Sequence, residues 1–335
     1  MILSVGIVAY NEKENLPILL KQLTEQTIDK GRVELLLIDS CSTDGTKQIF
    51  NDFKRDNELY FYGIEILDNP GKIQAAGWNV AIDSFKGDAL LRLDAHARIE
   101  RDFLQRNLEC LETGEMVCGG KRPNLPSSDK PLCKLVALAD RSIFGGSVGK
   151  YHESEGKKYV DTVFHGCYRK EVIEKVGHFN EKLGRTEDND FHRRIIESGF
   201  KICYDPRICS YQFSRDSVKG DIKQKYANGF WIGRTLGISP KCISPFHFVP
   251  FLFVAALAAA VVFGIFVSFL PLWLILGVYF TADIVLSIAA VLGEKEKLSV
   301  FWLLPVLLFL LHLAYGAGTA IGLLSIIYND PRKAV

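Results

Sequence analysis

The sequence predicts an α/β protein with a mostly parallel sheet, followed by helices that cross a membrane. Short β-branched apolar runs alternate with segments of helical periodicity in the N-terminal half, which is typical of a parallel sheet flanked by helices. After residue 245 the chain becomes almost wholly apolar. We therefore expect a folded domain over residues 1–235, a juxtamembrane connection over 236–245 and a transmembrane region of about three helices over 246–328.

The first two strands are predicted from their apolar runs. Residues 4–9 are continuously apolar and β-branched, as in a buried strand, and leucines at helical spacing follow over residues 16–23. Residues 33–38 form a second such run, which ends at Asp39. A turn and helix cap then come at residues 42–46.

Two further strands complete the predicted parallel sheet. We expect a strand over residues 60–66, a helix over 71–82 and a strand over 88–93, which ends before Asp94. Ligands of open α/β sheets bind beyond the carboxyl ends of the strands. The sequence therefore predicts that side chains at these ends, Asn11, Asp39 and Asp94 among them, line one crevice.

Several classes of function are disfavoured by what the sequence lacks. It has no G-x-G-x-x-G after the first strand and no G-x-x-x-x-G-K-[ST], which argues against dinucleotide oxidoreductases and P-loop enzymes. The formal net charge is +1, which gives no indication of a nucleic-acid partner. The eight cysteines form no C-x-x-C pair, and we expect most of them to be small buried residues rather than a disulfide framework.

Two groups of polar residues point to chemistry. Asp94 and His96 are two residues apart, so in a strand both would face one divalent cation. Glu187 and Asp188 form a later acid pair, which could equally begin and cap a helix. Together with the apolar C-terminal part, these groups indicate transfer from a charged donor to a membrane-associated acceptor.

The apolar part divides into stretches over about residues 246–269, 271–292 and 298–328, each longer than the roughly 20 residues that cross a bilayer. The uncharged turn at 268–271, the charged boundary at 294–297 and the lysines before the first stretch place the N-terminal domain in the cytoplasm by the positive-inside rule. The basic tail residues Arg332 and Lys333 would then lie outside, which the same rule disfavours. A re-entrant pair of helices is the alternative.

Four motifs carry a resemblance to a known family. They read Ile7-Val8-Ala9-Tyr10-Asn11-Glu12, Asp39-Ser40-Cys41-Ser42-Thr43-Asp44-Gly45-Thr46, Pro70-Gly71-Lys72 through Ala75, Ala76 and Asn79, and Glu187-Asp188 followed by Asp190. In turn they resemble P-x-Y-N-E, D-D-x-S-x-D-G-T, N-x-G-x-x-x-A-x-N and E-D-x-D of the family 2 glycosyltransferases. Ala9 stands where Pro is common, and Ser40 replaces the second Asp.

The resemblance covers roughly residues 2–235 and implies the nucleotide-binding GT-A fold. The D-x-D segment of the family reads Asp94-Ala95-His96 here. With the C-terminal membrane block, this variant is most similar to bacterial exopolysaccharide glycosyltransferases of the succinoglycan-synthesis type.

The resemblance implies a set of donor-binding residues. Asp39 would accept hydrogen bonds from the uracil or ribose of a nucleotide. Ala9, Asn11 and Glu12 belong to the same site, with a strand-end cap as the structural alternative for the two polar residues. Lys72 opens a helix and would contact the diphosphate, unless it is simply a solvated lysine.

The same resemblance implies a position for a metal ion. A diphosphate leaving group carries negative charge that a cation offsets. Asp94 would bind that cation and contact the donor, and His96 would be a second ligand or a hydrogen-bond donor to the diphosphate. Mg²⁺ prefers oxygen ligands, whereas imidazole suits borderline ions and Mn²⁺ also binds carboxylates. The metal is therefore Mn²⁺ or Mg²⁺.

The resemblance assigns the acceptor-binding and catalytic residues to the later part of the chain. Asp188 is the expected catalytic base, which takes the proton of the acceptor hydroxyl. Glu187 and His165 would contact the acceptor, although His165 could be a structural histidine. Trp231 and Arg234 would hold sugar and phosphate, or else belong to an amphipathic helix on the membrane surface.

We therefore predict an inverting, metal-dependent glycosyltransferase in the cytoplasmic membrane, multi-pass, with a cytoplasmic catalytic domain. It would move a sugar from a nucleotide-diphosphate donor, expected to be UDP-linked, to a lipid-linked saccharide. One alternative is a polyprenyl-phosphate sugar synthase, whose acceptor is already ionised and needs no base. Another is a non-catalytic nucleotide-sugar-binding scaffold of an export complex. The sequence predicts neither the sugar nor the oligomeric state.

Overall fold

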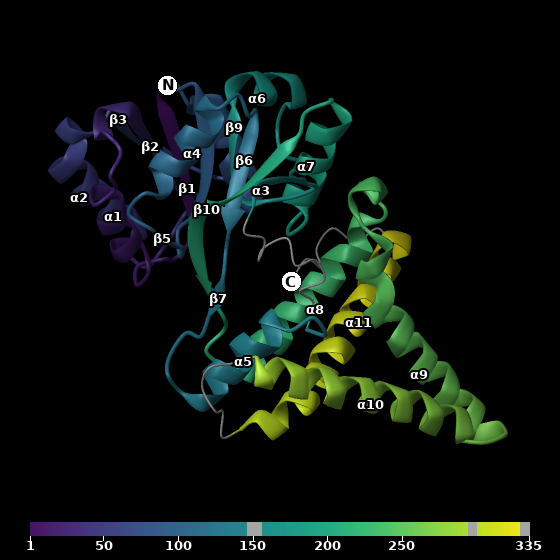
Figure 1. Cartoon of the computed structure of the whole chain (residues 1–335). Coiled ribbons are helices and arrows are strands. Elements are labelled where there is room, and N and C mark those ends of the chain that lie inside the picture. The colour runs from purple at the N-terminus through teal and green to yellow at the C-terminus, as the bar shows by residue number, and fades with distance from the viewer. Residues whose placement is uncertain (146–155, 294–299, 329–335) are drawn as a thin grey trace. The chain divides into compact units, whose positions relative to one another are not determined.

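The computed structural model describes residues 1–145, 156–293 and 300–328 (Figure 1). The chain forms two compact units. We call the first the sheet unit, which comprises Met1–Pro123 and Tyr151–Gln212. We call the second the helical unit, which comprises Asn124–Lys150 and Phe213–Val335.

The sheet unit is built on a mixed sheet with strand order β3-β2-β1-β4-β9-β6-β10-β5. The four strands at one side, β3, β2, β1 and β4, are mutually parallel, whereas β9 runs antiparallel to both β4 and β6. The short strands β5 and β8 pair antiparallel with β10. The strands span Leu3–Ala9 (β1), Val33–Asp39 (β2), Gly63–Asp68 (β3), Ala89–Asp94 (β4), Arg98–Ile99 (β5), Val117–Lys121 (β6), Lys158–Val160 (β8), Phe164–Arg169 (β9) and Ile202–Phe213 (β10).

Helices cover both faces of this sheet. They span Leu16–Thr24 (α1), Thr46–Asn57 (α2), Gln74–Ser84 (α3), Phe103–Glu112 (α4), Lys170–Val176 (α6) and Glu187–Glu197 (α7). One apolar cluster joins Leu3, Val5 and Ile7 of β1 to α1 and α4, and a second joins Leu36 and Ile38 of β2 to α3 and α7. Because both faces are covered, every residue of β2 is buried.

The predicted parallel half is confirmed with small shifts. The third strand begins at Gly63 rather than residue 60, because Glu58–Tyr60 forms a 3-10 turn. The helix predicted over 71–82 runs over Gln74–Ser84. Gly77 on α3 brings this helix close to β1, since a Cβ atom there would lie 2.6 Å from Val8 Cγ1.

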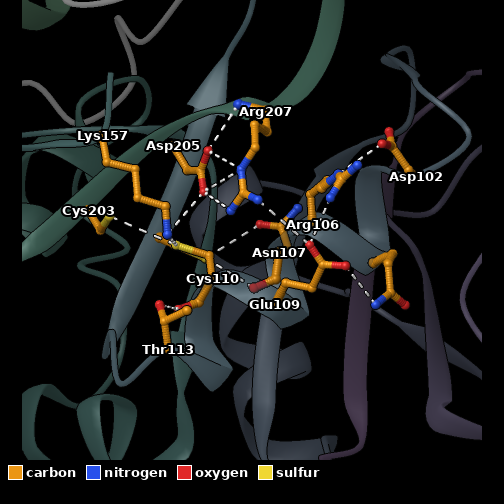
Figure 2. A network of polar contacts seen from close by, with 12 residues as sticks. Asp102, Arg106, Asn107, Glu109, Cys110, Thr113, Lys157, Cys203, Asp205 and Arg207 are labelled. Carbon is orange, nitrogen blue, oxygen red and sulfur yellow. Dashed lines mark hydrogen bonds and ion pairs between the residues drawn. The ribbon is translucent and has the colours of Figure 1, made fainter. Parts of the chain in front are cut away.

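A polar network joins α4 to β10 at one face of the sheet (Figure 2). The buried carboxylate of Asp205 contacts Arg207 Nη2 at 2.7 Å and Lys157 Nζ at 3.2 Å. The Sγ atoms of Cys110 and Cys203 lie 3.8 Å apart beside it. Both cysteines are free and buried, as are Cys118, Cys133 and Cys167, which confirms the prediction for most of the cysteines.

The helical unit contains α5 (Pro131–Arg141), α8 (Val218–Thr235), α9 (Val249–Phe266), α10 (Leu270–Leu292) and α11 (Leu304–Tyr328), with a short strand β7 at Asn124–Leu125. Helices over Pro245–Phe266, Leu270–Leu292 and Phe301–Tyr328 are long and apolar enough to cross a membrane. The charged boundary at 294–297 and the tail with Arg332 and Lys333 lie outside the described residues.

Candidate functional site

The loops after β1 and β2 are joined by hydrogen bonds at the carboxyl edge of the sheet. Asn11 Oδ1 accepts from the Thr43 amide at 2.8 Å, and the Asn11 amide donates to Ser42 Oγ at 3.0 Å. The Glu12 amide donates to Thr46 Oγ1 at 2.9 Å. Asn11 therefore holds the two loops together, which is the strand-end role that the sequence left as an alternative to nucleotide contact.

Asp39 lies at the end of β2, where the expected nucleotide would bind. It is directly paired in register with Ala9 of β1, is buried, and accepts from the Ser42 amide at 3.2 Å. Ala9 is also buried. Ser40, which replaces the family's second Asp, accepts from Asn69 Nδ2 at 3.0 Å and so links the ends of β2 and β3.

The described part of the chain has four non-glycine residues with a positive φ, and all follow or lie in strands that end near this edge. They are Asn11 (54°), Cys41 (61°), Lys72 (61°) and His165 (45°). Such conformations cost energy and gather at ligand sites. Lys72 itself is exposed, just before α3.

Asp94 ends β4, beside Val8 of β1, and is the centre of a charged cluster. His165 Nε2 lies 3.2 Å from Asp94 Oδ2, and Arg122 Nη1 lies 3.5 Å from the same oxygen. His165 Nδ1 lies 2.8 Å from Ser210 Oγ. The structure thus brings the predicted residues Asp94 and His165 together from strands β4 and β9.

The protonation of this cluster follows from burial and charge. Burial alone would raise the pKa of Asp94, but the hydrogen bond from His165 and the nearby positive charges outweigh it and hold the pKa well below its usual range. Burial lowers the pKa of His165. A neutral His165 then donates from Nε2 to the carboxylate and accepts the Ser210 hydroxyl proton at Nδ1, and Arg122 supplies the permanent positive charge.

His96 points to a different partner. Its Nδ1 lies 3.0 Å from Glu12 Oε1, and this hydrogen bond raises the pKa of the His96 imidazole. Its role as a metal ligand remains a prediction. Within the described residues, no group of three or more His, Cys, Asp or Glu side chains could hold a metal by itself. A cation at Asp94 would therefore need further ligands from the diphosphate and from water, as Mg²⁺ commonly does.

The acid pair begins helix α7. Thr186 is the N-cap, and Glu187, Asp188 and Asp190 lie in the first turn, so the pair begins a helix as the alternative interpretation predicted, without a capping hydrogen bond from the Thr186 side chain. Asp188 Oδ1 accepts from the Asn189 amide at 2.8 Å. Negative side chains at a helix N-terminus are favoured by the helix dipole. This placement is compatible with a catalytic role for Asp188, which stays a prediction.

Glu187 faces a residue that sequence reasoning did not assign. Its Oε1 lies 4.0 Å from Nη2 of Arg92, whose guanidinium stacks on Trp78 at 4.7 Å and Phe179 at 5.1 Å. Burial and the charge of Asp188 raise the pKa of Glu187 to about 7, and Arg92 opposes this shift. Arg92 is two residues before Asp94, so the alternation of β4 placed it on the same face.

Three buried polar atoms of this group have no hydrogen-bond partner among the described residues. They are Arg92 Nε, Trp78 Nε1 and Glu187 Oε2. Buried polar atoms are almost always satisfied, so exceptions call for an explanation such as an absent ligand. A polar ligand with hydroxyl groups would suit these two donors and one acceptor.

The remaining predicted acceptor residues lie in the helical unit. Trp231 and Arg234 are on α8, where the Arg234 guanidinium stacks over the Trp231 ring at 5.6 Å. Trp231 is buried. Their contact with an acceptor remains a prediction.

Arg122, Ser210 and Gln74, which lies 3.4 Å from Asp94, were missed because no local pattern in the sequence ties them to the acid.

Sequence comparison matches this chain to a glycosyltransferase family and to several related proteins. The profile described as "Glycosyl transferase family 2" matches residues 4–177. A Methanococcus voltae protein, described as dolichyl N-acetyl-alpha-D-glucosaminyl phosphate 3-beta-D-2,3-diacetamido-2,3-dideoxy-beta-D-glucuronosyltransferase, is 27% identical over 96% of this chain and 97% of its own length. The succinoglycan biosynthesis protein ExoA of Rhizobium meliloti is 25% identical over 59% of each chain.

Other relatives carry lipid phosphate in their names. The undecaprenyl-phosphate 4-deoxy-4-formamido-L-arabinose transferase of Photorhabdus laumondii is 28% identical over 58% of each chain. Among solved structures, the mannosyltransferase PcManGT from Pyrobaculum calidifontis, in complex with GDP-Man and Mn²⁺, has a TM-score of 0.60 at 18% identity, covering 98% of this chain and 87% of its own. This likeness confirms the GT-A fold that the sequence predicts.

Proposed function

Because the chain belongs to glycosyltransferase family 2, we propose that it moves a sugar from a nucleotide-diphosphate sugar to a lipid-linked saccharide at the membrane. The cluster of Asp94, His165 and Arg122 at the end of β4 carries the proposal. It combines an ionised carboxylate with an imidazole and a guanidinium at the sheet edge where ligands of α/β folds bind. A charged, cation-bridged diphosphate suits such a set.

The choice of acceptor rests on the relative that matches along its whole length. The Methanococcus protein, by its name, acts on a dolichyl sugar phosphate, and its similarity extends over 97% of its sequence. The relatives named for undecaprenyl phosphate match only 57–58% of their length. Full-length similarity includes the apolar helices, so it favours a sugar already attached to a lipid as the acceptor.

In this mechanism the residues at the ends of β1 and β2 bind the donor nucleotide. Asp39 accepts hydrogen bonds from the base or ribose. The backbone at Ala9 and the loop at Asn11 and Glu12 line the bottom of the nucleotide site. We expect UDP as the nucleotide. Lys72, exposed before α3, contacts the diphosphate.

Asp94 would hold a divalent cation, Mn²⁺ or Mg²⁺, together with diphosphate oxygens, and His96 would be a second ligand or a hydrogen-bond donor to the diphosphate. When bound, the cation neutralises the charge that develops on the leaving diphosphate. His165 and Arg122 orient the Asp94 carboxylate through their contacts of 3.2 and 3.5 Å.

Asp188 takes the proton from the acceptor hydroxyl while the hydroxyl oxygen bonds to the anomeric carbon. The bond from that carbon to the diphosphate breaks, and the nucleoside diphosphate leaves from the opposite side, which inverts the configuration. Glu187 and Arg92 lie next to Asp188, and their unpartnered atoms are available to acceptor or donor hydroxyls.

A polyprenyl-phosphate sugar synthase is the second candidate, and the undecaprenyl-phosphate relatives favour it. Its acceptor oxygen is already ionised, so it has no need of a base at Asp188. A non-catalytic scaffold is a weaker third candidate, because it has no use for an ionised Asp94 beside Arg122. In each case we place the protein in the cytoplasmic membrane with the sheet unit in the cytoplasm.

The experiment is a screen of nucleotide-sugars against the purified full-length protein with Mn²⁺ or Mg²⁺, reading released nucleoside diphosphate. Extracted lipid-linked saccharides and polyprenyl phosphate are supplied as separate acceptors. The proposal expects metal-dependent release that increases with a lipid-linked saccharide. Stimulation by polyprenyl phosphate alone would favour the second candidate, and a protein that binds donors but never releases the nucleotide would favour the scaffold.

A further inference from the structure

The three apolar helices of the helical unit differ in what covers them. α9 and α10 expose large apolar side chains along most of their length, including Phe266, Trp273 and Val278. In contrast, one face of α11 is buried against other helices of the same unit, through residues that include Leu304, Leu308, Gly318 and Gly322. Length and apolarity alone do not distinguish these helices, but their neighbours do.

Helix α8 accompanies α11 in the same direction with the backbones in contact (Figure 1). A Cβ atom at Gly229 would lie 2.0 Å from the Tyr315 carbonyl oxygen, and one at Gly233 would lie 2.4 Å from that of Thr319. At the other end, Val218 and Ile222 of α8 pack on an apolar cluster that contains Leu304 and Leu311. The two helices therefore run side by side over nearly the whole of α11.

Helix α8 is too polar to cross a bilayer beside its partner. Its residues of charged type are Lys219, Asp221, Lys223, Lys225 and Arg234. The uncharged stretch between Lys225 and Arg234 rises only about 13 Å at about 1.5 Å per residue, against a hydrocarbon core of about 30 Å. A transmembrane α11 would draw these charges into the hydrocarbon, where they are costly.

The middle of α11 lies beside a polar loop. His312 Nε2 donates to the Phe144 carbonyl at 2.6 Å, in the non-helical segment after α5. The next carbonyl, of Gly145, accepts from Lys225 Nζ at 3.1 Å, and Lys225 pairs with Asp140 at 2.9 Å. In a helix that crosses the bilayer, the middle lies at the bilayer centre, where neither non-helical backbone nor an ion pair is expected against lipid.

The same loop limits how deeply α9 and α10 can enter. The Tyr279 hydroxyl donates to His312 Nδ1 at 2.7 Å, and the Tyr279 ring stacks on Phe253 of α9 at 4.5 Å. From this level, α9 extends roughly 20 Å to Phe266, and α10 rises roughly 14 Å between Leu270 and Tyr279. Both arms are well short of the about 30 Å needed to cross.

We propose that the protein is monotopic: the α9–α10 hairpin enters one leaflet and returns, while α11 lies along the membrane surface under α5 and α8. The occupant of the exposed apolar face of α11 is the bilayer, because this face belongs to a helix in contact with both arms of the hairpin. That face includes Leu310, Ile321, Leu324 and Ile327. The proposal does not depend on the reaction.

This topology returns the chain to the side from which it entered. It therefore also removes the conflict between the positive-inside rule and the basic residues Arg332 and Lys333 of the sequence, because the end of the chain then shares the cytoplasmic side. It includes the re-entrant pair of helices that the sequence left as an alternative, and the neighbours of α11 add a surface position for the third helix. The apolar region would act as an anchor in one leaflet.

The test measures the depth of spin labels in the full-length protein reconstituted into phosphatidylcholine–phosphatidylglycerol vesicles. Labels are attached to Ser268→Cys at the hairpin tip and to Ala317→Cys on the open face of α11, two exposed positions where folding is not expected to change. The parent carries Cys41→Ser, since Cys41 is the exposed native thiol, and its residual signal is subtracted. Accessibility to oxygen and to a water-soluble nickel chelate gives the depth.

The proposal expects the Ser268→Cys label deep in the hydrocarbon, with high oxygen and low nickel accessibility, and the Ala317→Cys label near the surface. Transmembrane helices would give the reverse, with Ser268→Cys accessible to nickel at the far interface and Ala317→Cys deepest. Either reversal overturns the proposal. Lys219→Cys on α8 serves as the aqueous reference.

Discussion

The two units of this chain differ in where they place their charged side chains. In the sheet unit, ionisable side chains from β4, from β9 and from the residue after β6 converge, and Asp94 there has both an imidazole and a guanidinium within 3.5 Å. In the helical unit, α9 and α10 present bare apolar side chains, and charges gather on α5 and α8 instead. The difference agrees with the proposed roles of the two units, in which the first binds a charged donor and the second anchors the protein in lipid.

Among the donor-site residues, the largest effect is expected at the centre of the charged cluster. Asp94→Ala removes the carboxylate that binds the cation and diphosphate, and we expect turnover to fall by roughly 10²–10³-fold or more, as for other lost electrostatic contacts in active sites. Nucleotide release with saturating Mn²⁺ measures it.

The matched control is Asp68→Ala, which removes an exposed carboxylate at the end of β3 that pairs with Lys47. It should leave turnover near wild type. Equal losses in the two variants would mean that the edge of the sheet, rather than Asp94, had been damaged.

A smaller effect is expected at the nucleotide end of the same site. Asp39→Ala removes one charge-assisted hydrogen bond, worth about 1.5–3 kcal/mol, which corresponds to roughly a tenfold to hundredfold higher KM for the donor. The maximal rate should change less than KM. Steady-state kinetics over donor concentration separate the two, and an unchanged KM would remove Asp39 from the donor site.

The sequence predicted those parts of the site that depend on single strands. Strand ends are marked by local apolar runs, so Asp39 and Asp94 could be placed at one edge of a sheet. The contacts around Asp94 could not be predicted, because Arg122 and His165 reach it, and Ser210 reaches His165, only through the pairing of β6, β9 and β10. His96 was expected by alternation to face the metal. In the structure its Nδ1 lies 3.0 Å from Glu12 Oε1, a contact that the sequence did not predict, and its role as a ligand stays a prediction.

The helical unit was predicted in length but not in packing. Apolar stretches identify helices that could enter a membrane, and all three are present. The contact of α8 with α11 depends on glycines that have no periodic apolar signal of their own. For the same reason, the sequence could not show that a charged helix accompanies an apolar one.

The difference between the units also predicts that a substitution in the helical unit can lower stability without changing donor binding. Gly229→Val places a side chain against the Tyr315 backbone, and we expect the free energy of unfolding to fall by about 1–3 kcal/mol, as for overpacked cores. The KM for the donor should not change, since the site lies in the sheet unit. Thermal unfolding in detergent and donor kinetics check both parts.

Gly277→Val on α10 is the control, because a Cβ atom there meets nothing within 4 Å. It should leave the melting temperature close to that of the wild type. If both valine variants destabilise equally, the α8–α11 contact has no special importance.

The smallest expected effect concerns the pH dependence of stability. The folded-state pKa of Glu187 is raised to about 7 from an ordinary value of 4.5, mainly by burial. Its protonated form therefore stabilises the fold below pH 4.5, and this contribution is lost as the pH rises through about 7. Glu187→Gln should gain stability relative to wild type between pH 5 and 8, in melting curves at the two pH values. A constant difference would show that Glu187 is ionised throughout.

The central claim is that the acceptor is a hydroxyl of a lipid-linked saccharide, deprotonated by Asp188. The most direct measurement is the rate of sugar transfer to that acceptor by Asp188→Asn, with Glu197→Gln at the far end of the same helix as the control. We predict that Asp188→Asn lowers transfer by roughly 10²–10⁴-fold without changing the affinity for the donor, while the control transfers normally. Transfer by Asp188→Asn at the wild-type rate would contradict the account.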